Sequence, residues 1–310
     1  MSDLGRYILE EWREDYQEGR ISRRELLRRI TVFAGGAAAS IPLLHSLGVA
    51  ASAEEVSRAA AGPLPELPAA FASMVPPDDP AIDGRMVTFP AGSVSMIAYL
   101  AQPKGRPQSP GVLIVHENQG LLDHFKDVAR RFVKAGYAAI APDLASPAGG
   151  TARFTDPAEV TAYLGRTPPE QHVALLGGAV GYLQELPAVR RDRVGAIGFC
   201  FGGGLVWRLA AANPALKAAA PFYGSNPPIE DVPRIRAAIL AVYGAADERI
   251  DAGIPAIRQA MERAGVVHDI VIYAGAGHAF FNDTGARYNA SAAQDAWMRV
   301  LAWFARYLSA

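Results

Sequence analysis

The sequence predicts an α/β fold in which helices flank both faces of a mainly parallel central sheet. Two stretches carry this prediction. Residues 112–141 contain an apolar run, a segment with helical periodicity and a second apolar run, the pattern of two buried parallel strands joined by a helix. Residues 194–212 contain an apolar run, a glycine-rich turn and a helix-compatible segment. Because parallel strands end at the same edge of a sheet, we expect the functional residues at that edge.

The composition is that of a globular protein without a nucleic-acid partner. The chain has 310 residues, of which 50% are hydrophobic and 20% are charged, enough for one large domain with a sizeable core. The net charge is −1, and the body of the chain has no Lys/Arg run that would follow a phosphate backbone.

The sequence gives no indication of a metal or a cofactor. Its only cysteine, Cys200, excludes an intramolecular disulfide and any site with several cysteine ligands. The zinc motif H-E-x-x-H is absent, and no His/Cys cluster has the spacing of metal ligands. The glycine-rich turn after residue 197 does not match the dinucleotide motif G-x-G-x-x-G. We therefore expect neither a metal nor a nucleotide cofactor.

Residues 1–53 resemble a twin-arginine-type export signal. Residues 22–28 read S-R-R-E-L-L-R, with leucine and arginine where the motif usually has phenylalanine and lysine. Residues 30–49 are rich in Ala, Gly and Leu, and residues 51–53 form a small-x-small cleavage signal. We expect the precursor to engage the twin-arginine export machinery and the protein to be periplasmic or extracytoplasmic. A retained membrane anchor and an amphipathic helix packed on the domain are the alternatives.

Residues 54–83 are expected to form an extended arm laid over the domain. This segment contains several prolines, which exclude a long helix or a central strand. They are Pro63, Pro65, Pro68, Pro76, Pro77 and Pro80.

Residues 84–310 are expected to form the ordered domain. Eight short runs have the composition and periodicity of strands, and the first two form a hairpin. The expected strands are 85–89, 94–100, 112–115, 137–141, 194–197, 218–222, 238–243 and 269–273. The expected helices are 121–133, 171–186, 205–212, 254–264 and 288–308.

The turn around Cys200 has the pattern of a nucleophile elbow. An apolar run leads into a turn bounded by Gly198 and Gly202, with the thiol at its apex. This order matches G-x-S-x-G, in which small residues allow a strained turn to present the nucleophile above the sheet, with cysteine here in place of serine. The alternative interpretation is a buried cysteine that acts as a small hydrophobic residue.

Three other polar residues follow expected strands. Glu117 comes after the strand that ends at residue 115, Asp247 follows residue 243, and His278 follows residue 273. Cysteine, aspartate and histidine occur in the chain order of a nucleophile, acid and base triad. The histidine would take the thiol proton, and the carboxylate would fix the histidine tautomer. Two nearby acids, Glu248 and Asp251, are rivals of Asp247.

Five motifs in the expected order resemble the dienelactone hydrolase (carboxymethylenebutenolidase) family of the α/β-hydrolase superfamily. The resemblance covers residues 84–308 and implies the α/β-hydrolase fold without a large cap domain. The motifs are H-E-N-Q-G at 116–120, P-D-L at 142–144, G-F-C-F-G-G at 198–203, Y-G-A-A-D at 243–247 and G-A-G-H-A-F at 275–280.

The resemblance implies a role for each candidate residue. Cys200 would be the nucleophile that forms a thioester acyl-enzyme, with His278 as the base and Asp247 as its orienting acid. Glu117 would hold the resting thiol and move when substrate arrives. The backbone N–H groups that would form the oxyanion hole are those of Asn118 and Phe201.

One departure from the family concerns the substrate. The family binds a substrate carboxylate with arginines, one of them four residues after the catalytic histidine, and that position is Asn282 here. Arg153 and Arg287 are the candidates to replace it. We therefore expect a broader ester or lactone hydrolase, acting as a monomer or small homo-oligomer. The alternative is a noncatalytic or membrane-associated binding protein of the same fold.

Overall fold

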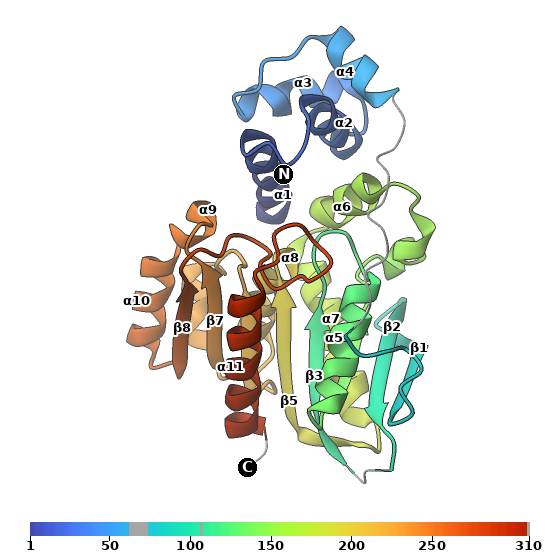
Figure 1. The fold of residues 1–310 in the computed structure, drawn as a ribbon, viewed down its shortest axis with the longest axis vertical. Helices are drawn as coiled ribbons and strands as arrows, with labels where there is room; N and C mark the ends of the chain where they lie inside the picture. Colours follow the sequence, from blue (N-terminus) through green and yellow to red (C-terminus); the bar gives the residue numbers. More distant parts are fainter. Residues whose placement is uncertain (62–73, 106–107, 309–310) are drawn as a thin grey trace.

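The computed structural model describes residues 1–61, 74–105 and 108–308, and its centre is an eight-stranded sheet. The strand order is β1-β2-β4-β3-β5-β6-β7-β8 (Figure 1). The β1/β2 and β2/β4 pairs are antiparallel, and all other neighbours are parallel. The strands are β1 (Ile82–Ala91), β2 (Val94–Pro103), β3 (Ser109–Val115), β4 (Ala138–Pro142), β5 (Val189–Phe199), β6 (Ala218–Phe222), β7 (Ala238–Gly244) and β8 (His268–Tyr273).

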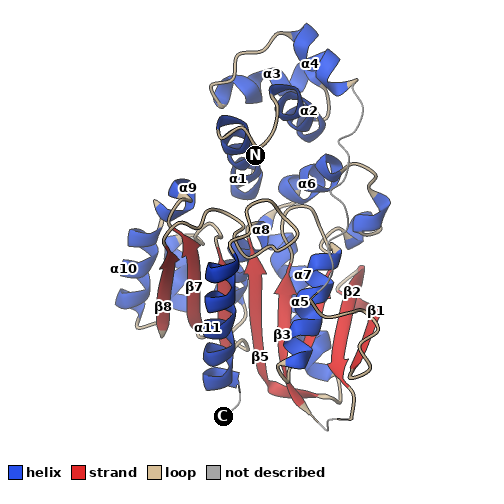
Figure 2. Ribbon diagram, in the orientation of Figure 1, coloured by secondary structure: helices blue, strands red, loops and turns tan. Residues whose placement is uncertain are grey.

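Helices cover both faces of this sheet. α5 (Asp123–Lys134) and α11 (Ala290–Leu308) lie on one face, and α7 (Pro169–Glu185) and α8 (Phe201–Ala212) lie on the other (Figures 1 and 2). Every residue of β4, β6 and β7 is buried, which explains why these strands read as continuous apolar runs. The expected α/β-hydrolase architecture is therefore confirmed.

All the elements expected in the domain are present, and α10 (Ile254–Ala264) has the expected bounds. The sequence analysis did not identify α6 (Pro157–Arg166), which the Asp156 side chain caps by accepting a 2.8 Å hydrogen bond from the Ala158 N–H. The sequence pattern also did not predict two short helices in the loops that follow the strands: η2 (Thr151–Arg153) and α9 (Glu248–Asp251). These elements are too short, or too irregular in pattern, for periodicity to reveal.

The N-terminal segment forms four helices that lie over the carboxyl edge of the parallel strands (Figure 1). They are α1 (Asp3–Gln17), α2 (Arg23–Ala34), α3 (Ala37–Ser46) and α4 (Ala53–Ala60). Residues 1–53 were expected to lie outside the domain, whereas the structure packs them on it. They cover an edge of the sheet for which no large cap domain was expected. Helix α1 contacts α6 and α8. Export of the protein is a separate matter and stays a prediction.

Buried charges help to hold this segment on the domain. Arg28 of α2 is buried, pairs with Glu25 at 2.8 Å and forms an ion pair with Asp156 at the start of α6. These carboxylates raise the pKa of Arg28 although burial opposes them, with the Glu25 hydrogen bond as the largest cause. The last residue of the twin-arginine-like motif is therefore part of the contact between α2 and α6.

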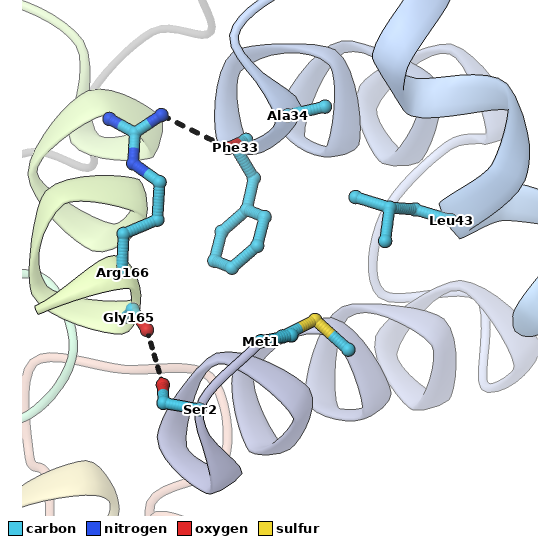
Figure 3. Close-up of a pocket in the computed structure, with 7 residues that line it drawn as sticks. All are labelled: Met1, Ser2, Phe33, Ala34, Leu43, Gly165 and Arg166. Atoms are coloured by element: carbon cyan, nitrogen blue, oxygen red, sulfur yellow. Dashed lines mark hydrogen bonds between the residues drawn. The ribbon is translucent and has the colours of Figure 1, made fainter. Parts of the chain in front are cut away.

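A small pocket marks the same junction (Figure 3). It has a volume of about 210 Å³ and lies where α1, α2 and α3 meet α6. At its rim the Ser2 hydroxyl donates to the Gly165 carbonyl at 2.9 Å, and Arg166 donates to the Phe33 carbonyl at 3.1 Å. Its lining residues are Met1, Ser2, Phe33, Ala34, Leu43, Gly165 and Arg166.

Among the described helices, none is by itself long and apolar enough to cross a membrane. Helices α2 and α3 meet that length and hydropathy only as a pair, and they are bent by 114° relative to each other.

The expected proline-rich arm is only partly within the described residues, since residues 62–73 lie outside them. Its first part differs from the expectation, because residues 54–60 belong to α4, which begins with a capping box formed by Ser52 and Glu55. At its other end, the N–H groups of Met74 and Val75 donate to the Asp127 carboxylate of α5 at 3.0 and 2.9 Å. This end of the segment therefore lies against the domain.

Candidate active site

Cys200 lies at a sharp turn between β5 and α8. Its φ of 56° and ψ of −120° are strained for a residue with a side chain, and its N–H donates to the Phe222 carbonyl at 3.0 Å. A Cβ atom at Gly198 would overlap the Gly202 carbonyl, and one at Gly202 would overlap the His116 carbonyl. The two glycines are therefore needed for the turn to close, as in a nucleophile elbow.

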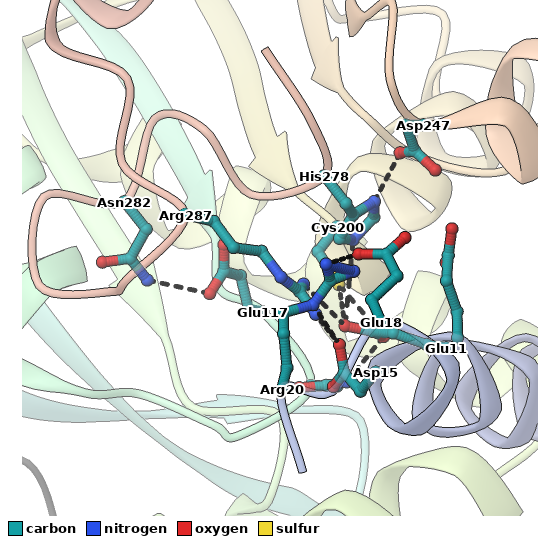
Figure 4. A network of polar contacts seen from close by, with 12 residues as sticks. Glu11, Asp15, Glu18, Arg20, Glu117, Cys200, Asp247, His278, Asn282 and Arg287 are labelled. Carbon is teal, nitrogen blue, oxygen red and sulfur yellow. Dashed lines mark hydrogen bonds and ion pairs between the residues drawn. The ribbon is translucent and has the colours of Figure 1, made fainter. Parts of the chain in front are cut away.

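The structure brings the three expected triad residues together. His278 Nδ1 lies 2.5 Å from Asp247 Oδ2, and both residues are buried (Figure 4). The Cys200 thiol and His278 face each other, and the Tyr7 hydroxyl lies 3.2 Å from both Cys200 Sγ and His278 Nε2. The rival Asp251 is on the helix that follows Asp247, and the hydrogen bonds of His278 to carboxylates in the described residues include none to it.

Two side chains of α1 also reach this centre, and sequence reasoning missed both. The hydroxyl of Tyr7 contacts the thiol, and the carboxylate oxygens of Glu11 lie 3.6 and 3.8 Å from Cys200 Sγ. Glu11 also accepts a 2.9 Å hydrogen bond from the Asn118 side chain. The sequence pattern that could have revealed this helix is a serine cap followed by an amphipathic segment. Its apolar face consists of Leu4, Tyr7, Ile8 and Trp12.

Arginines of the domain hold α1 in this place. Arg249 pairs with Glu14 at 3.2 Å, and its guanidinium lies 4.6 Å from the centre of the Tyr7 ring. Arg287 forms an ion pair with Asp15 and lies 3.8 Å from Glu11 (Figure 4). Of the two arginines considered for substrate binding, Arg287 is therefore beside the site, whereas Arg153 is exposed.

Glu117 is close to the centre but does not hold the thiol. Its Oε2 accepts a 2.9 Å hydrogen bond from the Asn282 side chain, and burial raises the pKa of its carboxyl group. The carboxylate in hydrogen-bond range of the Cys200 thiol is that of Glu11. The expected contact between Glu117 and Cys200 is thus absent among the described residues, because Asn282 takes one oxygen of Glu117 and α1 places Glu11 beside the sulfur.

The environment keeps the substrate-free thiol protonated. The pKa of the Cys200 thiol is raised to about 11, mainly by burial and also by the charge of Glu11. His278 opposes this increase. Burial alone would lower the pKa of His278, but the charge of Asp247 opposes burial and raises it above the ordinary value, and ionisation of Cys200 would raise it further. In this closed arrangement Cys200 is therefore a shielded thiol at neutral pH.

A comparison with protein-family models shows the family of this chain. Residues 96–308 match the model described as the dienelactone hydrolase family. The chain belongs to the dienelactone hydrolase family. It is accordingly a hydrolase with the α/β-hydrolase fold.

Individual relatives of this dienelactone hydrolase family member extend over most of the domain. A protein of Synechocystis sp., provisionally named a carboxymethylenebutenolidase, is 37% identical over 234 residues, which are 71% of this chain and 95% of that protein. A counterpart from Escherichia coli K12 is 34% identical over 247 residues, which are 74% of this chain and 89% of that protein.

Solved structures give the same result. A crystal structure from Klebsiella pneumoniae, provisionally named a dienelactone hydrolase, is 34% identical with a TM-score of 0.68, and the match covers 73% of this chain and 100% of that one. A dienelactone hydrolase-like promiscuous phosphotriesterase from metagenomic libraries is 27% identical with a TM-score of 0.63, covering 73% of this chain and 99% of that one. The family match, over residues 96–308, covers the part of the chain that carries Cys200, Asp247 and His278.

The two backbone N–H groups expected to form the oxyanion hole remain free of acceptors in the described structure. Phe201 begins α8 directly after the nucleophile, and Asn118 follows Glu117 after β3. Within the described part of the chain, neither N–H donates to an acceptor. Both groups are therefore available to a carbonyl oxygen that approaches Cys200.

Alkylation of Cys200 is expected to depend on pH according to its raised pKa. Since the thiolate is the reactive form, the rate with iodoacetamide should rise steadily as the pH approaches about 11. Glu11→Gln removes a charge that raises the thiol pKa, so its alkylation profile should shift to lower pH. Stopped-flow alkylation measures both, with Glu10→Gln on the same helix as the control. A wild-type midpoint near the ordinary cysteine value would contradict the closed site.

Disrupting the docking of α1 is expected to expose the thiol. Ile8 is fully buried and lies so close to Gly165 of α6 that a Cβ atom there would clash with it. Ile8→Asp would bury a charge, at a cost of at least about 3 kcal/mol, so the ratio of docked to open molecules should fall by about 100-fold. Alkylation of Cys200 at pH 8 should accelerate to a similar extent, whereas Ile8→Val should remain close to wild type. Equal rates for all three proteins would mean that α1 does not shield Cys200.

Proposed function

We propose that this protein hydrolyses carboxylic esters or lactones through a thioester on Cys200. The observation that supports this proposal is a buried Asp247–His278 pair, joined at 2.5 Å, beside a thiol held on a strained elbow. Histidine oriented by a carboxylate is the arrangement that activates a cysteine or serine nucleophile.

In the first half of the proposed reaction, His278 Nε2 takes the proton of the Cys200 thiol. The sulfur attacks the carbonyl carbon of the substrate, and the N–H groups of Asn118 and Phe201 stabilise the oxyanion that forms. When the intermediate collapses, the carbon–oxygen bond to the leaving group breaks and the leaving oxygen receives the proton from His278. The products of this half are an alcohol, or the opened ring of a lactone, and a thioester on Cys200.

In the second half, His278 takes a proton from water, and the hydroxide equivalent attacks the thioester carbonyl. The carbon–sulfur bond breaks, the acid leaves, and the proton returns to the Cys200 sulfur. The raised pKa of the free thiol fits this cycle, because a protonated cysteine resists oxidation between turnovers. In a chain that still carries residues 1–53, substrate reaches the sulfur only when Tyr7 and Glu11 of α1 have moved away from it.

The acyl-enzyme can be observed directly. Intact-mass measurement after mixing with a slowly hydrolysed ester should show one acyl group per chain, and peptide mapping should place it on Cys200. Hydroxylamine should remove the group, as expected for a thioester. An adduct at another residue, or turnover with no dependence on Cys200, would contradict the mechanism. A protein that binds the ester without forming an adduct would instead be the noncatalytic binding protein.

We propose that the substrate is a broad class of simple esters or lactones and that a substrate carboxylate is not required. Asn282 stands where the family has an arginine, and Arg287 is engaged with Asp15 and Glu11. Comparison of kcat/KM for simple aryl esters and carboxylate-bearing lactones tests this proposal. A strong preference for the charged lactone would overturn it.

We further propose that residues 1–53 direct export through the twin-arginine machinery. The S-R-R-E-L-L-R segment and the A-S-A sequence before Glu54 support this proposal. Cell fractionation with N-terminal sequencing should find a periplasmic form that begins at Glu54. A full-length protein confined to the cytoplasm would contradict it.

A further inference from the structure

Three potential metal ligands meet at the contact between α1 and the catalytic pair. Among the residues that the structure describes, Glu11, Cys200 and His278 form a buried group whose ligand atoms all lie within 4.8 Å of one another. They offer a carboxylate oxygen, a sulfur and an imidazole nitrogen, which are the three donor types that zinc binds in proteins. The sequence analysis expected no metal because these residues are far apart in the chain and fit no motif.

The spacing of the donors fits a tetrahedral ion. Zinc bonds of about 2.0 to 2.3 Å place the ligand atoms of a tetrahedron about 3.3 to 3.8 Å apart. Here Glu11 lies 3.6 and 3.8 Å from Cys200 Sγ through its two oxygens and 3.8 Å from His278 Nε2. The Tyr7 hydroxyl lies 3.2 Å from both Sγ and Nε2 and supplies the fourth corner. An ion of this size therefore fits among the four groups with only small movements.

The surrounding contacts orient the donors as a zinc site requires. His278 presents Nε2 to the centre because its Nδ1 lies 2.5 Å from the Asp247 carboxylate, which is the usual carboxylate–histidine–metal arrangement. Glu11 is oriented by the 2.9 Å hydrogen bond from Asn118. Each of these two ligands thus has a partner that fixes its position before an ion arrives.

We propose that Glu11, Cys200 and His278 form a binding site for a divalent cation of the zinc class, with Tyr7 at the fourth position. On binding, the Cys200 thiol and the protonated His278 Nε2 each release a proton to solvent, so the sulfur coordinates as a thiolate and Nε2 through its lone pair, while His278 keeps its proton on Nδ1. The thiolate and the Glu11 carboxylate together balance the 2+ charge, so the buried site becomes neutral. No electron transfer takes place.

Binding has a consequence that rests on the proposed function. The same ion would hold the nucleophile, the base and a side chain of α1, so it would lock the helix over the site and inhibit hydrolysis reversibly. Arg287 lies 3.8 Å from Glu11 and competes with the ion for that carboxylate. Because the ion would join Glu11 of α1 to Cys200 and His278 of the domain, metal binding and helix docking should strengthen each other.

Cobalt and zinc titrations of the reduced full-length protein test the site. Co²⁺ should bind one ion per chain and give visible tetrahedral bands together with a thiolate-to-cobalt charge-transfer band, and Zn²⁺ should displace it. Glu11→Gln should weaken zinc binding by at least about 100-fold in competition with a chromophoric chelator, because the loss of a direct ligand exceeds the usual effect of a residue behind the ligands. Cys200→Ser should abolish the charge-transfer band. Glu10→Gln, on the same helix but outside the group, should bind like wild type.

The outcomes separate this site from the proposed function. Equal zinc affinity of wild type and Glu11→Gln, or the absence of stoichiometric binding, would overturn the site even if hydrolysis is observed. Stoichiometric binding with the expected spectra would support it even in a protein without esterase activity. Where hydrolysis is observed, zinc should inhibit wild type, a chelator should restore it, and Glu11→Gln should require at least about 100-fold more zinc for the same inhibition.

Discussion

Replacement of Cys200 by alanine is expected to reduce the kcat for ester hydrolysis by at least about 10⁴-fold, since loss of the nucleophile disables a triad as a unit. The fold should be retained, because the side chain that remains fits the same elbow and the strained backbone is set by Gly198 and Gly202. Steady-state kinetics with an aryl ester measures the loss, and thermal unfolding checks the fold.

The serine variant is the matched control for this change. Cys200→Ser keeps a group that His278 can deprotonate, so its activity should lie between those of wild type and Cys200→Ala. It should also accumulate an ester rather than a thioester adduct, which resists neutral hydroxylamine longer. Full activity in Cys200→Ala would show that another residue or water performs the attack.

The second large effect is expected for Asp247→Asn, which should lower kcat by about 10³ to 10⁴-fold. Asp247 is 1% exposed, and its charge is the main influence that raises the pKa of His278 against the effect of burial. Without that charge the pKa of His278 falls, and the amide no longer selects the tautomer that presents Nε2 to the sulfur. The loss should therefore be accompanied by a shift of the acid limb of the kcat/KM profile to lower pH.

Asp251 provides the matched control. It lies one helical turn after Asp247, and its pKa is raised to about 6, first by burial and then by the charge of Asp247. Asp251→Asn removes a neighbouring carboxylate of the same kind without a contact to His278, so the pH profile and kcat should change little. A larger loss in Asp251→Asn than in Asp247→Asn would show that Asp251, and not Asp247, orients His278.

The catalytic edge could be predicted because its constraints are local. The sequence places Cys200 between Gly198 and Gly202, and this spacing indicates a tight turn. Nearby carbonyl groups leave no room for a side chain at either glycine. Asp247 lies in the loop after β7, which ends at Gly244, and His278 lies in the loop after β8, which ends at Tyr273, and parallel strands bring such loops to one edge. The order of the elements therefore contained most of the geometry of the three residues.

The contribution of α1 could not be predicted because it depends on contacts distant in the chain. Tyr7 and Glu11 reach Cys200 across 193 and 189 residues, and no local pattern encodes such a contact. The polar appearance of residues 1–20 also concealed an apolar stripe whose partner surface, on α6 and α8, is known only once the domain has folded. The same contact explains why Glu11, and not Glu117, lies within hydrogen-bond range of the Cys200 thiol in this structure.

The contact of Tyr7 and Glu11 with the Cys200 sulfur is expected to affect the kcat/KM for substrate but not the rate of thioester hydrolysis. Under the proposed mechanism, substrate would react only with molecules of the uncleaved chain in which α1 has lifted, so the observed kcat/KM would be the intrinsic value multiplied by the fraction of open molecules. An acyl group on Cys200 would occupy the space that Tyr7 and Glu11 fill in the closed form, so hydrolysis of the proposed thioester would proceed at a rate that the helix does not limit. Substitutions on the inner face of α1 would therefore tune how often the enzyme starts a catalytic cycle while leaving the rate at which it finishes one unchanged.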